Sequence, residues 1–141
     1  MRALLCTEYG MADKLQLATD HPEPTAEAGQ VVFDIKAAGL NFPDVLIIQG
    51  KYQFQPDMPF SPGGECAGVV LSVGEGVDRY KVGDKVIAMT GSGCFRDQIA
   101  VDQHAVMPMP EGLDFKQAAG VAMTYFTSYH ALKQRADLKE G

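Results

Sequence analysis

The sequence predicts a mainly β protein with a few helices, of the α+β class, built around a partly open antiparallel barrel. Short β-rich segments recur along the first two-thirds of the chain, and glycine-rich turns separate them. The 141 residues are 46% hydrophobic and 21% charged, which is the composition of an ordinary globular domain that can bury a core.

Four segments carry the strand pattern. In residues 30–38 hydrophobic side chains recur at every second position, which is the period of a half-buried strand. Residues 68–73 form a β-branched run that ends in a glycine-rich turn. The pattern continues in residues 85–89 and 97–101, with a Gly-Ser-Gly loop between them. We therefore expect short strands joined by tight turns.

Two regions carry helix signals. Pro43 suits the first turn of a helix and Gly50 lies just past its end, so we expect a short helix over residues 43–49. Asp114, followed three residues later by glutamine, fits the start of a capping box. One or two helical segments should follow it, through residues 118–132.

Charge and hydropathy exclude several classes of partner. The net charge of −6 gives no electrostatic reason to bind nucleic acid or an anionic membrane, since both require clustered Lys and Arg. No apolar run approaches the roughly 18–20 residues that span a bilayer, and the N-terminus has too short an apolar stretch for a signal peptide. We expect a cytoplasmic protein without a nucleic-acid or membrane partner.

The cysteines predict neither a disulfide framework nor a zinc knuckle. Cys6, Cys66 and Cys94 are odd in number and widely spaced, without a Cys-x-x-Cys pair. We expect reduced and mostly buried thiols. Cys66 has no basic neighbour in the sequence that would lower its pKa, which argues against a nucleophilic role.

Two glycine-rich segments carry a family resemblance. Residues 62–70 read PGGECAGVV, and VGDKV follows at 82–86. The first resembles the PGxExxGxV signature of the medium-chain dehydrogenase/reductase superfamily. Residues 38–52, AGLNFPDVLIIQGKY, are similar to its zinc-independent quinone oxidoreductase branch, as are the first residues and AMTYFTSYHAL near the end. Glu65 lies in the first segment. Because this segment is apolar, the Glu65 carboxylate requires a hydrogen-bond partner.

The resemblance covers the whole chain and implies a domain organisation. Residues 1–125 correspond to a GroES-like catalytic domain, and residues 126–141 to a helix leading into a Rossmann domain. We expect that domain to lie outside this chain, because no strand–GxGxxG–helix unit occurs in it. The family binds NADPH and a small-molecule substrate between its two domains, and the resemblance implies a homodimer formed through the missing one.

The resemblance also bears on metal binding. In the zinc alcohol dehydrogenases of this superfamily, Cys, His and Cys ligands stand where this chain has Asn41, Gly64 and Met123. An amide, a glycine and a thioether do not replace such ligands. The four-cysteine lobe of a structural zinc is also missing, since Cys94 stands alone in its region. We expect no metal and a substrate that accepts hydride without one, namely a quinone or an α,β-unsaturated carbonyl compound.

Tyr52 is the predicted proton donor. It follows the short helix, in the position of a catalytic tyrosine in the related enoyl thioester reductases. A phenol with a pKa near 10 is protonated at neutral pH and can donate a proton or a hydrogen bond, to the substrate or the cofactor. The alternative is a tyrosine that packs at the helix end with its hydroxyl in solvent.

Four further residues are predicted to contact the cofactor. Asn41 suits the nicotinamide ribose or a substrate oxygen, and so could also take part in catalysis, or it caps the helix at Pro43. Asp44 fixes Asn41 or a water, or favours the positive helix start. Thr127 and Met123 lie in the segment that reaches the nicotinamide in this family, although a buried threonine could instead bond back to its own helix.

Two other functions stay open at this point. One is a stand-alone GroES-like module for binding or assembly without catalysis, since a fold does not determine a function. The other is an enoyl thioester reductase, because the substrate pocket depends partly on residues outside this chain.

Overall fold

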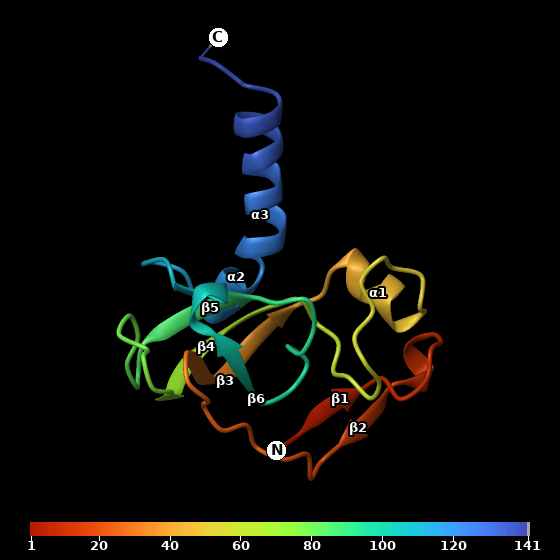
Figure 1. The fold of residues 1–141 in the computed structure, drawn as a ribbon. Helices are drawn as coiled ribbons and strands as arrows, with labels where there is room; N and C mark the ends of the chain where they lie inside the picture. Colours follow the sequence, from red (N-terminus) through yellow and green to blue (C-terminus); the bar gives the residue numbers. More distant parts are fainter. Residues whose placement is uncertain (141) are drawn as a thin grey trace.

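The computed structural model describes residues 1–140, and its centre is a curled antiparallel sheet of five strands (Figure 1). The strand order is β6-β3-β4-β5-β7, so β6 and β7 form the two edges of a sheet that is partly open. The strands are β3 (Gln30–Gly39), β4 (Glu65–Val73), β5 (Lys85–Met89), β6 (Gln98–Asp102) and β7 (Val106–Pro108). Together with the helices, this sheet confirms the predicted α+β class.

The main core packs against the sheet. Its largest members are buried aliphatic and aromatic side chains. Tyr80 belongs to this core, and its hydroxyl donates a hydrogen bond to the Val106 carbonyl at 2.5 Å. β3 and β4 approach closely where Gly68 pairs with Ile35, because a Cβ at Gly68 would lie 2.1 Å from the Asp34 carbonyl oxygen. A glycine at that position is therefore part of how the sheet curls.

A small two-stranded sheet lies beside the main one. It pairs β1 (Ala3–Leu5) with β2 (Gln16–Ala18), and η1 (Ala12–Lys14) stands between them. Backbone bridges from Ala3 to Arg96 and from Cys6 to Phe60 join it to the rest of the molecule. The sequence does not predict these strands, because three residues are too few to display a period of two.

The helices follow the predicted signals. They are α1 (Phe42–Ile48), α2 (Phe115–Ala119), α3 (Val121–Tyr129) and η3 (His130–Arg135). The predicted capping box is present, since the Gln117 N–H donates to Asp114 at 2.8 Å and the Asp114 N–H donates to Gln117 at 3.0 Å. Gly120 separates α2 from α3 and so divides the expected helical region in two.

Some strand boundaries were predicted wrongly. β4 begins at Glu65 rather than at residue 68, because Glu65 already pairs with Gly39 of β3 and Met89 of β5. Its first three residues, Glu-Cys-Ala, lack the β-branched side chains that mark the remainder. β6 is shifted by one residue from the predicted 97–101, and β7 was not identified.

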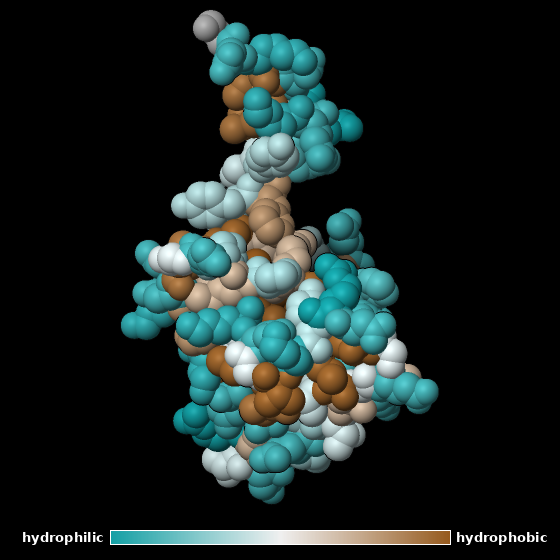
Figure 2. Space-filling view, turned by 90° about the vertical axis from the view of Figure 1, so that its left-hand side faces the viewer, coloured by the Kyte–Doolittle hydropathy of each residue, from teal (hydrophilic) through white to brown (hydrophobic). Residues whose placement is uncertain are grey.

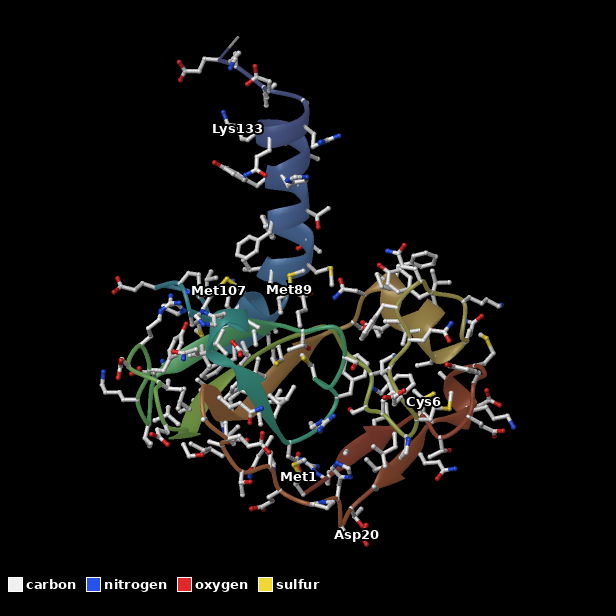
Figure 3. All side chains as sticks on the ribbon, viewed as in Figure 1. Met1, Cys6, Asp20, Met89, Met107 and Lys133 are labelled. Atoms are coloured by element: carbon white, nitrogen blue, oxygen red, sulfur yellow. The ribbon has the colours of Figure 1, made fainter. Side chains whose placement is uncertain are left out.

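The last helical part projects from the body of the molecule (Figures 1 and 2). Figure 3 shows Met89, at the end of β5, near the base of α3, and the two elements are in contact. From Thr124 onwards the helix is exposed, including Tyr125 and Tyr129. Within residues 1–140, no helix is both long enough and apolar enough to cross a membrane.

Candidate active site

Glu65 is the centre of the candidate site. Its side chain is buried, with 2% of its surface exposed. One carboxylate oxygen accepts a hydrogen bond from Nδ2 of Asn41 at 2.8 Å, and the other accepts from the backbone N–H of Met123 at 2.8 Å. Glu65 therefore links the start of β4 to the start of α1 and the first turn of α3, and it has the partners that its burial requires.

Asp44 forms the second buried carboxylate of the site, with 4% of its surface exposed. It accepts a hydrogen bond from the backbone N–H of Asn41 at 2.8 Å, and the N–H groups of Gly63 and Gly64 also favour its ionised form. Asp44 thus holds the backbone of Asn41, one of the roles that the sequence left open. Asn41 does occupy the N-cap position, while its side-chain NH2 group is directed to Glu65.

The three positions that carry zinc ligands in the alcohol dehydrogenases meet at this cluster. A Cβ built on Gly64 would lie 3.4 Å from Cε of Met123 and 3.8 Å from Oδ1 of Asp44. Asn41 and Met123 both donate a hydrogen bond to Glu65. The side chains here offer an amide, a thioether and two carboxylates, and both oxygens of Glu65 already accept hydrogen bonds, which leaves a poor donor set for zinc. Across residues 1–140, no group of three or more His, Cys, Asp and Glu side chains is arranged to hold a metal ion.

Burial raises the pKa of Asp44. Removal of the carboxylate from water is the largest cause, and the nearby charge of Glu65 acts in the same direction. The N–H groups of Asn41, Gly63 and Gly64 oppose this shift, because they stabilise the ionised form. The carboxylate therefore ionises at a cost to the folded state.

This shift predicts how stability depends on pH. The folded state holds the Asp44 proton more tightly than the unfolded state, so its contribution is largest at low pH and is lost as pH rises through the raised pKa. We expect the stability of the wild-type protein relative to Asp44→Asn to fall as pH rises from about 4, where an ordinary aspartate titrates. Chemical denaturation of both proteins at a series of pH values measures this difference; a constant or rising difference would contradict it.

Tyr52 lies at the opposite end of α1 from Asn41. Its ring is half-buried and packs against the cluster of Ile47, Ile48 and Phe60. Gln55 holds the following loop, because its side chain donates to the Tyr52 carbonyl at 3.2 Å and to the Gly50 carbonyl at 2.7 Å. The packing expected of a tyrosine at a helix end is present, and its role in proton transfer stays a prediction.

Met123 and Thr127 share one face of α3, since they are four residues apart. Met123 is half-buried in the Glu65 cluster, whereas Thr127 is exposed one turn further along the helix. The back-bonded hydroxyls of this helix belong to Thr124 and Ser128. Thr127 is therefore exposed in this chain, and its contact with a cofactor stays a prediction. The structure brings together Asn41, Asp44 and Met123, and places Tyr52 and Thr127 outside that cluster.

The cysteines agree with their predicted state. All three are free and buried. A hydrogen bond with Cys94 and burial raise the pKa of Cys66, which keeps this thiol protonated.

Comparison with known proteins gives a consistent result. The protein-family model of the alcohol dehydrogenase GroES-like domain matches residues 27–111 of this chain. The synaptic vesicle membrane protein VAT-1 homolog of Danio rerio is 40% identical over 131 residues, which are 93% of this chain and 27% of the relative. The quinone oxidoreductase of Homo sapiens is 37% identical, over 100% of this chain and 43% of that protein.

The solved structures agree with this. The quinone oxidoreductase of Thermus thermophilus, whose complex with NADPH is also known, aligns with a TM-score of 0.84 at 35% identity, over 100% of this chain and 43% of that one. Sheet, helices and site together define a GroES-like domain of the alcohol dehydrogenase type. The chain belongs to that family and thus to the medium-chain dehydrogenase/reductase superfamily, which confirms the resemblance seen in its motifs. It spans less than half the length of these relatives.

Proposed function

We propose that this chain is the substrate-side domain of an NADPH-dependent, zinc-free oxidoreductase that reduces quinones or α,β-unsaturated carbonyl compounds by hydride transfer. The observation that carries the proposal is the cluster of Asn41, Gly64 and Met123 around Glu65, in a chain 37% identical to a quinone oxidoreductase. A quinone or an enone accepts hydride without the help that a metal gives to an alcohol.

The orientation of Asn41 supports a contact with the cofactor or the substrate. A carboxylate only accepts hydrogen bonds, so the NH2 group of Asn41 must face Glu65. Its Oδ1 faces the start of α1, where it takes part in the capping box and keeps a second lone pair for a ligand. An acceptor fixed in this way suits a hydroxyl donor such as a ribose. Asp44 holds the backbone of the same residue, so both its main chain and its side chain are positioned before a ligand binds.

The backbone at Gly64 lies close against the cluster. A Cβ there would be 3.3 Å from the Thr90 carbonyl oxygen and 3.4 Å from Cε of Met123, so the absence of a side chain allows this close approach. Asn41, Asp44, Met123 and Thr127 would contact the nicotinamide side of NADPH, with Tyr52 near the substrate. NADPH supplies the hydride, while its phosphates would bind to a Rossmann domain outside this chain.

Tests of this proposal require the full-length protein. We expect it to oxidise NADPH in the presence of a benzoquinone or an enone, at a rate that a zinc chelator leaves unchanged. Absorbance of the reduced cofactor measures the rate, with NADH in a parallel reaction. Oxidation of a primary alcohol that stops on chelation would contradict the zinc-free assignment, and no turnover with either acceptor would contradict the substrate class.

Two further properties belong to the same proposal. A homodimer would form through the Rossmann domain, and the mass of the full-length protein in solution measures it. The location would be cytoplasmic, which fractionation of cells that express the natural protein can test.

A further inference from the structure

A cavity of about 310 Å³ lies at a different place from the Glu65 cluster. It is bounded by β1, β3 and residues 94–97, and Figure 1 shows β1 at the end of the molecule opposite α3. Three cationic side chains line it, Arg2, Lys36 and Arg96, and Asp97 is the one acid among the lining residues. This is a local excess of positive charge in a chain whose net charge is −6.

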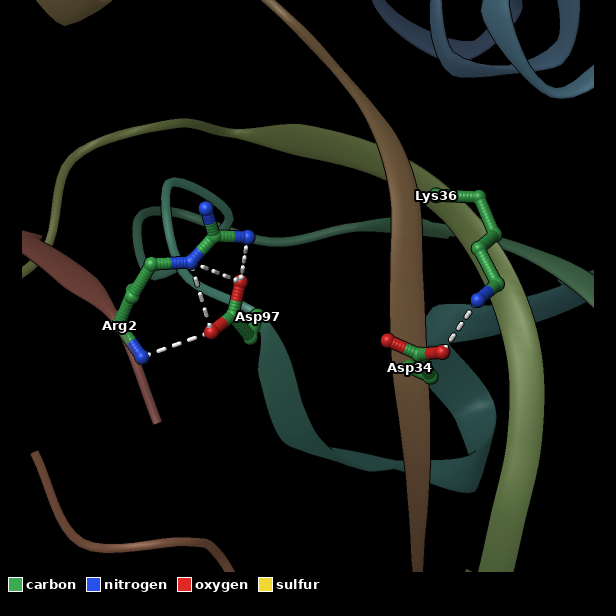
Figure 4. Close-up of polar contacts among 4 residues, drawn as sticks. All are labelled: Arg2, Asp34, Lys36 and Asp97. Atoms are coloured by element: carbon green, nitrogen blue, oxygen red, sulfur yellow. Dashed lines mark hydrogen bonds and ion pairs between the residues drawn. The ribbon is translucent and has the colours of Figure 1, made fainter. Parts of the chain in front are cut away.

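Two of the three cations are already paired (Figure 4). Nη2 of Arg2 lies 2.9 Å from Oδ1 of Asp97, and the backbone N–H of Arg2 also donates to this carboxylate, at 2.7 Å. Lys36 forms an ion pair with Asp34, which stands two residues before it on β3. These pairs fix Arg2 and Lys36 at the edges of the cavity.

Arg96 is the exception. No ion pair or side-chain hydrogen bond engages its guanidinium within residues 1–140, and its Nε is buried without an acceptor. Buried donors in folded proteins nearly always have a partner, and a half-buried cation without a counterion is less stable than a fully hydrated one. Burial accordingly lowers the pKa of Arg96. An anion in the cavity would accept a hydrogen bond from Nε of Arg96 and would balance the charge of its guanidinium.

The rest of the lining indicates which anion. Leu4, Ile35 and Phe95 provide apolar walls, and Leu17 stands at the rim with 65% of its surface exposed. A bare inorganic anion would leave these walls without contact, whereas a molecule with a hydrocarbon body would cover them. The planar guanidinium matches a carboxylate through two parallel hydrogen bonds.

We propose that this cavity binds a small amphipathic carboxylate, with its carboxylate on Arg96 and its hydrocarbon chain against Leu4, Ile35 and Leu17. The site is separate from the proposed hydride-transfer site, and nothing in its assignment depends on the proposed reaction.

Binding of octanoate to the full-length protein, measured by titration calorimetry, tests the site. We expect saturable binding, weakened about tenfold or more in Arg96→Gln, because one charge-assisted pair is lost. Arg135→Gln is the matched control, since it removes an exposed arginine of η3 far from the cavity, and its affinity should equal that of the wild type. Octan-1-ol, which lacks the carboxylate, should bind more weakly than octanoate.

Leu17→Glu gives a second test that does not depend on Arg96. Leu17 is exposed, so the substitution should leave the fold intact, while its negative charge at the rim should weaken octanoate binding. Equal affinity in wild type, Arg96→Gln and Leu17→Glu would overturn the site. Octan-1-ol that binds as well as octanoate would overturn the role of the charge, and inorganic phosphate that binds as well as octanoate would overturn the role of the apolar walls.

Discussion

Replacement of Glu65 by alanine is expected to lower the free energy of unfolding by about 3–5 kcal/mol, because it removes the acceptor of two buried donors. The Asn41 amide and the Met123 N–H both donate to this carboxylate at 2.8 Å. Without it, both donors are left unpaired in a buried region, and α1 and α3 lose their common link to β4. Urea denaturation followed by circular dichroism measures the change.

Two control variants sharpen this test. Glu65→Gln keeps one acceptor oxygen but turns an NH2 group toward one of the two donors, so an intermediate loss is expected. Glu111→Ala removes the same carboxylate from an exposed position and should change stability by less than about 0.5 kcal/mol. If Glu65→Ala were as stable as Glu111→Ala, the link between β4 and the two helices would not contribute to folding.

The elements that the sequence predicts well are those whose signal is local. The alternation in β3, the proline and glycine around α1 and the capping box at Asp114 each act within a few residues, and all appear in the structure. The predicted start of β4, at residue 68, lies too far along the chain. Glu65 is held in the strand by its pairing with β3 and β5 and not by its own propensity.

The site was predictable only in part for the same reason. The family resemblance indicated that Asn41, Gly64 and Met123 correspond to the zinc-ligand positions of the alcohol dehydrogenases, and the structure shows these residues together. The link from Glu65 to Met123 joins residues 58 positions apart through a backbone N–H, which no side-chain pattern reports. The sequence does not indicate Arg96, because its environment depends on β1 and β3, and an isolated arginine after a glycine-rich loop gives no periodic signal.

The second large effect is expected at Tyr52. In the full-length protein, Tyr52→Phe should lower kcat for an enone by about 100-fold or more, which is the usual contribution of a positioned general acid. The ring should still pack on Ile47 and Ile48, so stability and the KM for NADPH should change little. Steady-state kinetics over a range of both substrates separates these effects. The kcat for a quinone should fall less than that for an enone, because a quinone needs the proton later in the reaction.

Tyr9→Phe is the matched control, because it removes another tyrosine hydroxyl, one that helps to hold the same loop. Tyr9 donates to Gln55 at 2.7 Å, and Gln55 in turn donates to the carbonyl of Tyr52. A loss in Tyr9→Phe as large as that in Tyr52→Phe would show that the loop's position, and not the Tyr52 hydroxyl, limits the rate. Full activity in Tyr52→Phe would remove this tyrosine from the mechanism and leave proton delivery to solvent or to residues of the Rossmann domain.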